Sequence, residues 1–188
     1  MLLNLPNLVT LLRILLIPLI VGIFYVPDAW MTDQDKNLVA TAVFIFAAVT
    51  DWLDGYLARR LNQMSAFGAF FDPVADKLVV IGALIVLLHL KRVDMVVGLI
   101  IIGREVAISA LREWMAQVGQ SKSVAVAFIG KLKTTLQMIA IPLLLYEDWL
   151  FGTIECYALG TVLINVAAVL TVISMLYYMR RALPPAQG

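Results

Sequence analysis

Six long apolar segments run along the chain, and short polar stretches separate them. Their approximate bounds are 8–26, 38–59, 70–90, 94–115, 126–146 and 156–179. Each is close to the length of about 20 mostly apolar residues that an α-helix needs to cross a bilayer. The preceding residues 2–8, LLNLPNL, have the pattern of a short amphipathic element at a membrane surface. The pattern predicts an all-α integral membrane protein with six transmembrane helices and a short N-terminal interfacial helix.

The composition agrees with a membrane protein. Hydrophobic residues make up 62% of the 188 residues and charged residues 14%, whereas a soluble domain is nearer to about one half and about one quarter. We find no internal repeat or long linker, which predicts a single domain over residues 1–188. The net charge of +1 gives no indication of a nucleic-acid partner. The start MLLNLPNLVTLLR has no positive region before its apolar stretch, so we expect no cleaved signal peptide.

The ionisable residues within the segments fall in one half of the membrane when the N terminus is placed in the cytoplasm. They are Arg13, Asp51, Asp54, Arg59, Asp72, Asp76, Lys77, Arg104, Glu105, Arg112, Glu113, Lys131 and Lys133. Charged side chains at membrane depth face a protein interior or a water-filled cavity. The arrangement therefore predicts one polar cavity open to the cytoplasm. The lysine and arginine bias of the loops also favours cytoplasmic termini.

Glycines inside the segments predict places where two helices approach closely, because a missing side chain lets backbones come together. They are Gly22, Gly82, Gly98, Gly103 and Gly160.

Four carboxylates lie in residues 51–76, DWLDGYLARRLNQMSAFGAFFDPVAD. Asp51 and Asp54 are three residues apart and share one helix face. Asp72 and Asp76 share a face if one helix includes both, but Pro73 could instead place Asp72 at a helix start. Carboxylates held together need cations, and oxygen ligands without histidine or cysteine favour Mg²⁺ or Mn²⁺ over zinc. The alternative is that these residues are charges at the membrane surface that cap two helices.

The pattern D-x2-D-G-x2-A-R-x8-G-x3-D-x3-D is complete in this stretch. Its eight fixed positions are Asp51, Asp54, Gly55, Ala58, Arg59, Gly68, Asp72 and Asp76. The pattern resembles the signature of the CDP-alcohol phosphotransferases, which are integral membrane enzymes of phospholipid synthesis. The resemblance implies that the aspartates bind two divalent cations, Mg²⁺ or Mn²⁺, with Asp76 as the candidate general base. It also implies that Gly55, Ala58, Arg59 and Gly68 form the CDP-diacylglycerol pocket.

Polar residues recur every third position near the N terminus, at Asn7, Thr10 and Arg13. Arg13 either extends to the lipid headgroups or joins a polar contact with substrate. The segment PNLVTLLR resembles the N-terminal segment of one branch of the family, which favours the second interpretation. On this basis Asn7 and Thr10 are also expected to contact CDP-diacylglycerol.

Cations in the second half of the chain predict an anion pocket beside the carboxylates, since arginine and lysine are the usual phosphate ligands. The candidates are Arg104, Arg112, Lys131 and Lys133. The alternative is local pairing of Glu105 or Glu113 with neighbouring arginines, together with lysines that extend to the headgroups.

The stretch from Arg104 to Ala140 resembles the family branch whose acceptor is sn-glycerol 3-phosphate. The resemblance implies transfer of the phosphatidyl group from CDP-diacylglycerol to this acceptor, which gives phosphatidylglycerophosphate and CMP. It further implies a homodimer in the bacterial inner (cytoplasmic) membrane, surrounded by membrane lipids.

Two other functions remain open at this point. A different acceptor, serine or inositol phosphate, would use the same aspartates. A cation transporter would use them as a transport site, although the chain lacks an inverted repeat and its charges lie away from the midplane.

Overall fold

The computed structural model describes residues 5–60, 66–117 and 128–182, with the side chains left out at some of these positions. The described elements are α1 (Leu5–Ile23), α2 (Asp33–Arg60), α3 (Ala66–His89), α4 (Met95–Gln117), α5 (Phe128–Tyr146), β1 (Trp149–Leu150), β2 (Ile154–Glu155) and α6 (Cys156–Ala182). Each of the six predicted segments lies largely within one helix, which confirms the all-α prediction. The two strands form a small antiparallel hairpin before α6, with Trp149 opposite Glu155.

Local capping groups explain two of the helix starts. Thr32 precedes α2, where its hydroxyl accepts a hydrogen bond from the Asp35 backbone N–H (3.2 Å) and donates one to Asp35 Oδ2 (2.6 Å). Asp94 precedes α4, and its Oδ1 accepts from the Val96 backbone N–H at 2.8 Å. Such side chains satisfy amide groups that a helix start leaves without a partner.

Two boundaries differ from those that the sequence predicts. Residues 5–8 belong to α1, so the described part of the N terminus shows one continuous helix rather than a separate interfacial element. Helix α3 begins at Ala66, so Pro73 lies inside it and Asp72 is not at a helix start. A proline inside a helix removes one backbone hydrogen bond, and α3 continues in spite of this loss. Asp72 and Asp76 therefore share one face of α3.

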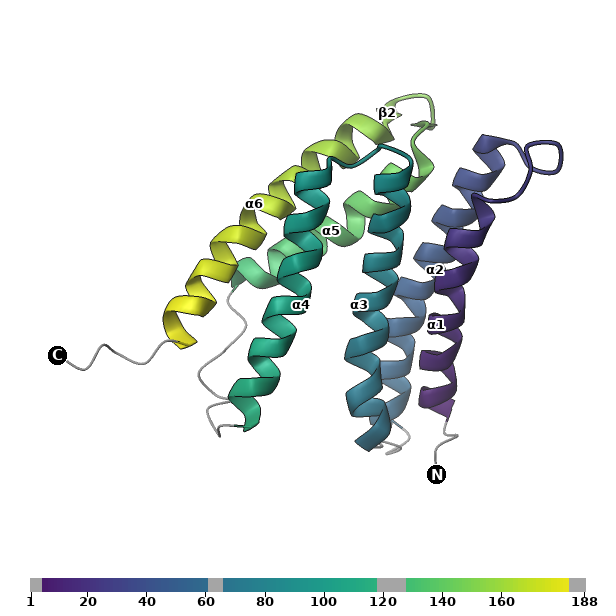
Figure 1. Ribbon diagram of the computed structural model, residues 1–188. Coiled ribbons are helices and arrows are strands. Elements are labelled where there is room, and N and C mark those ends of the chain that lie inside the picture. Colours follow the sequence, from purple (N-terminus) through teal and green to yellow (C-terminus); the bar gives the residue numbers. More distant parts are fainter. Residues whose placement is uncertain (1–4, 61–65, 118–127, 183–188) are drawn as a thin grey trace.

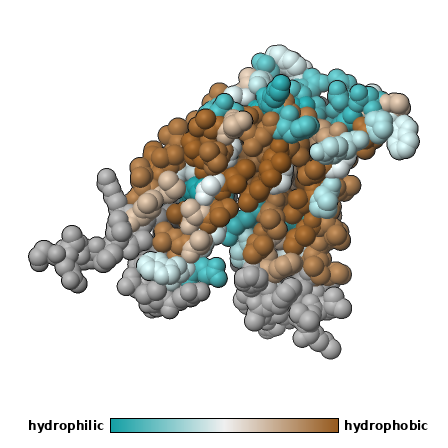
Figure 2. All heavy atoms as spheres, viewed as in Figure 1, coloured by the Kyte–Doolittle hydropathy of each residue, from teal (hydrophilic) through white to brown (hydrophobic). Residues whose placement is uncertain are grey.

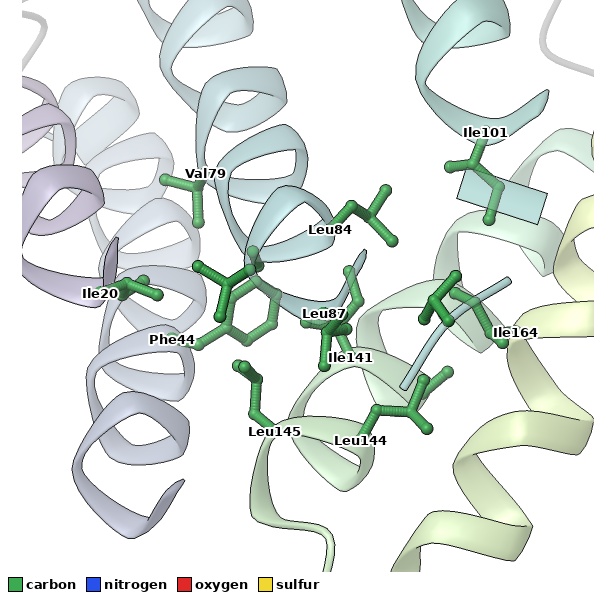
Figure 3. Close-up of a cluster of buried hydrophobic side chains, with 14 of the residues drawn as sticks. Ile20, Phe44, Val79, Leu84, Leu87, Ile101, Ile141, Leu144, Leu145 and Ile164 are labelled. Carbon is green, nitrogen blue, oxygen red and sulfur yellow. The ribbon is translucent and has the colours of Figure 1, made fainter. Parts of the chain in front are cut away.

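The helices run up and down in alternation, as Figure 1 shows. Helix α1 packs against α2 and α3, while α6 packs against α4 and α5. Helix α5 also contacts α2 and so joins the two groups. Buried apolar side chains fill the space between them; Ile20, Phe44, Leu84, Leu87 and Leu145 are examples (Figure 3).

Arg92, in the connection between α3 and α4, binds α2 and the end of α5 at the end of the bundle where the connections 24–32, 90–94 and 147–155 lie (Figure 1). Its guanidinium donates to the Leu145 carbonyl at the end of α5 (2.9 Å) and to Asn37 Oδ1 on α2 (3.0 Å). It also pairs with Glu147. Burial lowers the pKa of Arg92, and the Glu147 carboxylate opposes this shift. We call these residues the distal clamp.

The outer surface of the helices is strongly apolar. Large side chains such as Leu15, Leu99 and Val162 are 67%, 69% and 59% exposed. Figure 2 shows hydrophobic residues over the middle of the molecule and hydrophilic ones at the end of the distal clamp. Exposed apolar area on this scale is typical of a surface that faces lipid.

One segment within the described residues, Cys156–Leu176 of α6, is long and apolar enough to cross a membrane by itself. Leu8–Ile23 is a shorter apolar helix. The other segments carry the charges discussed below, so six spans stay a prediction.

Three of the five glycines lie at close helix contacts, as predicted. A Cβ atom would come within 2.8 Å of Ile17 Cγ2 at Gly82, of Leu88 Cδ2 at Gly98 and of Leu144 Cγ at Gly160. The prediction is wrong for Gly22 and Gly103, where no described atom lies within 4 Å of such a Cβ. At these two positions the missing side chain faces open space.

Candidate functional site

A cavity of about 490 Å³ lies between the helices, and α1 to α5 all contribute to its lining. The polar residues that line it are Arg13, Asp51, Asp76, Lys77, Arg104, Glu105, Lys131, Thr134, Thr135 and Gln137. Carboxylates come from α2, α3 and α4, while α1, α3, α4 and α5 supply cations. The pocket brings polar side chains of several helices together, while a polar cavity open to the cytoplasm stays a prediction.

Arg13 joins the carboxylates of two other helices. Its side chain is 1% exposed, and one guanidinium nitrogen donates to Asp51 Oδ1 on α2 at 3.0 Å and to Asp76 Oδ1 on α3. The two aspartate side chains are 50% and 44% exposed, so they are accessible at the cavity wall. Arg13 therefore makes a polar contact inside the bundle, and the alternative that it extends to the headgroups is wrong.

Thr10 repeats this contact one turn earlier on α1. Its hydroxyl donates to Asp72 Oδ1 at 2.6 Å. The three-residue spacing of Thr10 and Arg13 thus matches the four-residue spacing of Asp72 and Asp76 on α3. Thr10 lies beside a predicted metal ligand, while its predicted contact with CDP-diacylglycerol stays a prediction.

The donor atoms present fit a divalent cation. Carboxylate oxygens from α2 and α3 meet at one guanidinium, and such hard oxygen ligands suit Mg²⁺ or Mn²⁺. Across the residues that the structure describes, no three metal-binding side chains lie close enough to form a complete site. The side chain of Asp54 lies outside the described residues, so the predicted cluster of four aspartates stays a prediction.

Glu105 of α4 forms ion pairs with cations of α4 and α5. Its Oε1 accepts from Arg104 at 3.3 Å and from Lys133. Arg104 also donates to Ser174 Oγ on α6 at 3.4 Å. Lys133 is 1% exposed and is not among the described residues that line the cavity. Glu105 therefore balances buried positive charge: its pair with Arg104 fits the alternative of local pairing, whereas its pair with Lys133 of α5 joins two helices.

Two lysines line the cavity without such a partner. In the described parts of the chain, neither Lys77 of α3 nor Lys131 of α5 forms an ion pair. Their ammonium groups are thus available to an anion that enters the cavity. Lys131 was predicted as a phosphate ligand and Lys77 was not, although its place after Asp76 in the sequence puts it near the cavity.

Several predicted residues have no described side chain. Asn7 lies in α1, the residues Gly55, Ala58 and Arg59 lie in α2, and Arg112 lies in α4, but their side chains fall outside the described residues. Gly68 is buried in α3. The predicted roles of all six stay predictions.

Sequence reasoning missed Gln137, which lines the cavity from α5. A lone amide in an apolar segment gives no sign of which way it faces. Arg13 and Glu105 were noticed for their positions, but their bonds across helices could not be derived from spacing alone.

Comparisons with known proteins identify the family of this chain. The sequence model of the CDP-alcohol phosphatidyltransferase family matches residues 3–175. The chain is 49% identical over 182 residues to the CDP-diacylglycerol–glycerol-3-phosphate 3-phosphatidyltransferase of Salmonella choleraesuis (strain SC-B67), which covers 95% of this chain and 94% of the relative.

Similar values relate the chain to proteins of the same name from two other bacteria. The identity is 49% for the protein of Escherichia coli (strain K12), and 48% for that of Shigella flexneri serotype 5b (strain 8401). Both matches cover 95% of this chain and 94% of the relative. The family match and these identities extend over the helices that form the cavity, and so this chain belongs to the CDP-alcohol phosphatidyltransferase family.

Proposed function

We propose that this chain transfers the phosphatidyl group of CDP-diacylglycerol to sn-glycerol 3-phosphate, giving phosphatidylglycerophosphate and CMP. The observation that carries the proposal is the 49% identity, over 95% of the chain, to enzymes named for this reaction. The cavity supports it, because carboxylates and cations line the same space. The product leads to the anionic lipids phosphatidylglycerol and cardiolipin.

The proposed metal ligands are Asp51, Asp54, Asp72 and Asp76, holding two Mg²⁺ or Mn²⁺ ions. Bound cations would supply positive charge against the diphosphate of CDP-diacylglycerol. Arg13 holds Asp51 and Asp76 at the cavity wall, and Thr10 holds Asp72 beside them. These contacts fix the directions in which the carboxylates point, which favours a preorganised site.

The reaction forms a bond between the primary hydroxyl oxygen of glycerol 3-phosphate and the lipid-linked phosphorus. The bond from that phosphorus to the oxygen of CMP breaks, and CMP leaves with the electron pair. Asp76 is the proposed general base that takes the hydroxyl proton. Its half-exposed carboxylate at the cavity wall supports this role.

The donor headgroup is proposed to lie against the end of α2 and the start of α3. The residues proposed to bind it are Asn7, Thr10, Gly55, Ala58, Arg59 and Gly68. Small residues there would let the nucleotide approach the backbone, and Arg59 would pair with the diphosphate.

The acceptor phosphate is proposed to bind the cations opposite the carboxylates. The set is Arg104, Arg112 and Lys131, to which we add Lys77 because it lines the cavity; Lys133, the fourth cation predicted from the sequence, is buried outside the cavity lining. Lys131 and Lys77 would contact the phosphate most directly, since Glu105 already balances Lys133. Six helices would cross the bacterial inner membrane as a homodimer, with both termini in the cytoplasm.

The test is CMP release by the purified protein with CDP-diacylglycerol and Mg²⁺, with one acceptor in each reaction. We expect release with sn-glycerol 3-phosphate and none with serine or inositol phosphate. Release with another acceptor would keep the aspartate chemistry and overturn the assignment of the cations. No release with any acceptor, in folded protein, would overturn the proposed function.

A further inference from the structure

Gln137 has hydrogen-bonding capacity that the rest of the described chain does not use. Its side chain is 4% exposed and lines the cavity from α5. Its Oε1 atom is buried and has no hydrogen-bond partner among the residues that the structure describes. A buried polar atom without a partner has lost its hydrogen bonds to water and gained none in return, which is unfavourable. A water molecule or a ligand that enters the cavity can supply the missing bond.

The wall of the cavity that Gln137 lines contains apolar residues as well as polar ones. Val79 and Val80 of α3 and Met138 of α5 are among the apolar ones. Gln137 follows Lys131 by six residues, which places it about 9 Å further along the axis of α5. Lys131 therefore lies near the start of α5, and Gln137 lies further along the helix, deeper in the bundle.

The acceptor of the proposed reaction carries three polar groups. Its phosphate suits the lysines, and its primary hydroxyl must meet the lipid-linked phosphorus beside Asp76. The secondary hydroxyl, on the carbon between them, then needs a partner of its own. We propose that the Gln137 amide binds this secondary hydroxyl and thereby selects a polyol phosphate as acceptor. The assignment rests on the proposed function.

The assignment has a direct consequence for acceptor choice. An enzyme site that hydrogen-bonds a substrate hydroxyl rejects the analogue that lacks it, because the amide is then left without a partner. The compound 3-hydroxypropyl phosphate keeps the primary hydroxyl and the phosphate but lacks the secondary hydroxyl. We expect the wild-type enzyme to prefer sn-glycerol 3-phosphate over this analogue by about tenfold or more in kcat/KM.

The experiment compares kcat/KM for the two acceptors in wild type, Gln137→Met and a control, Met138→Leu. Met138 lines the same cavity but offers no hydrogen bond through an amide. In Gln137→Met the preference should fall to about one, with the loss confined to glycerol 3-phosphate. Met138→Leu should keep the wild-type preference. An unchanged preference in Gln137→Met, or no preference in wild type, would overturn the assignment.

Thermal unfolding separates this role from a structural one. Gln137→Met replaces an amide without a partner by an apolar chain of similar length, so Tm should stay the same or rise. A marked fall in Tm would show that Gln137 stabilises the fold and would count against a role in binding. Gln137→Leu offers a second apolar variant if the first does not fold. Wild-type protein that releases no CMP with glycerol 3-phosphate would overturn the proposed function itself, whereas the other contrary outcomes overturn only the role of Gln137.

Discussion

Polar side chains of this site form pairs, and each pair joins two different helices. Thr10 with Asp72 and Arg13 with Asp76 form two successive contacts between α1 and α3. The sequence predicted the polar face of α1 and the aspartates of α3, because each follows helical spacing. It could not show that the two faces meet, since spacing contains no information on which helices are neighbours.

The two lysines of α5 illustrate the same limit. Lys131 lines the cavity, whereas Lys133 is buried against Glu105. Two residues correspond to about 200° of rotation around a helix, so the side chains leave on nearly opposite faces. The sequence analysis placed both in one phosphate pocket, and this rotation would have separated them.

Replacing Asp76 by asparagine should abolish turnover and leave the protein folded, because the amide cannot take a proton yet keeps the size of the side chain. CMP release and thermal unfolding measure the two effects. Asp94→Asn is the matched control, since Asp94 caps α4 in a polar loop and asparagine also caps helices well. Near-normal turnover in Asp76→Asn would remove Asp76 from the role of general base.

Replacing Lys131 by alanine should raise the KM for glycerol 3-phosphate by about tenfold and leave the KM for CDP-diacylglycerol unchanged. The reason is the loss of a cation that faces the cavity without an ion-pair partner among the described residues. Lys91→Ala provides the comparison, because Lys91 is an exposed lysine in the connection between α3 and α4. Equal effects of the two substitutions on the acceptor KM would contradict a place for Lys131 in the pocket.

At the scale of the elements, hydrophobic pattern determined most of what could be predicted. Each helix contains most of its predicted apolar segment, and capping by Thr32 and Asp94 accounts for two starts. The start of α3 was harder, because the bias against helix before Pro73 conflicted with the apolar run that precedes it. In the structure α3 includes this apolar run and continues through Pro73.

Close packing between α5 and α6 makes Gly160 sensitive to substitution. In Gly160→Ala the new Cβ would lie 2.8 Å from Leu144 Cγ and 3.3 Å from the Ala140 carbonyl oxygen. We expect a loss of about 1–3 kcal/mol in stability, seen as a lower Tm in detergent. Gly103→Ala should leave Tm unchanged or raise it, since no described atom opposes its Cβ and alanine favours helix. If Gly103→Ala lowered Tm and Gly160→Ala did not, close contact between helices would not be the cause of the change in stability.

At the scale of the whole molecule, polar groups divide between two ends of an apolar bundle. The β1–β2 hairpin and the connections next to it lie at one end of the bundle (Figure 1). Asp51 lies in the second half of α2, and Asp76 and Lys131 lie in the first halves of α3 and α5, which places them toward the other end. The overall composition predicted the apolar bundle. The placement of the charged residues of the apolar segments in one half of the membrane predicted the polar end that contains the cavity. The distal clamp was not predicted, because Arg92 and Glu147 are 55 residues apart in sequence.

Labelling of introduced cysteines tests the proposed orientation. In a Cys156→Ser background, Thr153→Cys in the hairpin should react with a membrane-impermeant maleimide added to intact cells. Glu113→Cys, near the end of α4, should react after the cells are opened. Both side chains are exposed in the structure, so a difference in labelling reports the side of the membrane. The reverse result would invert the orientation and place the cavity on the outside.

The apolar cluster between the cavity and the distal clamp has a consequence for the permeability of the membrane. An enzyme that brings charged water-soluble substrates into a bilayer must not let protons or sodium pass through it. Ile20, Leu84, Leu87 and Leu145 are at most 1% exposed, and they fill the space beyond the cavity with tightly packed hydrocarbon. Ions face a large desolvation penalty in such a layer. Sealed vesicles that contain this protein should therefore hold a voltage as well as vesicles without it, even while CMP is being released.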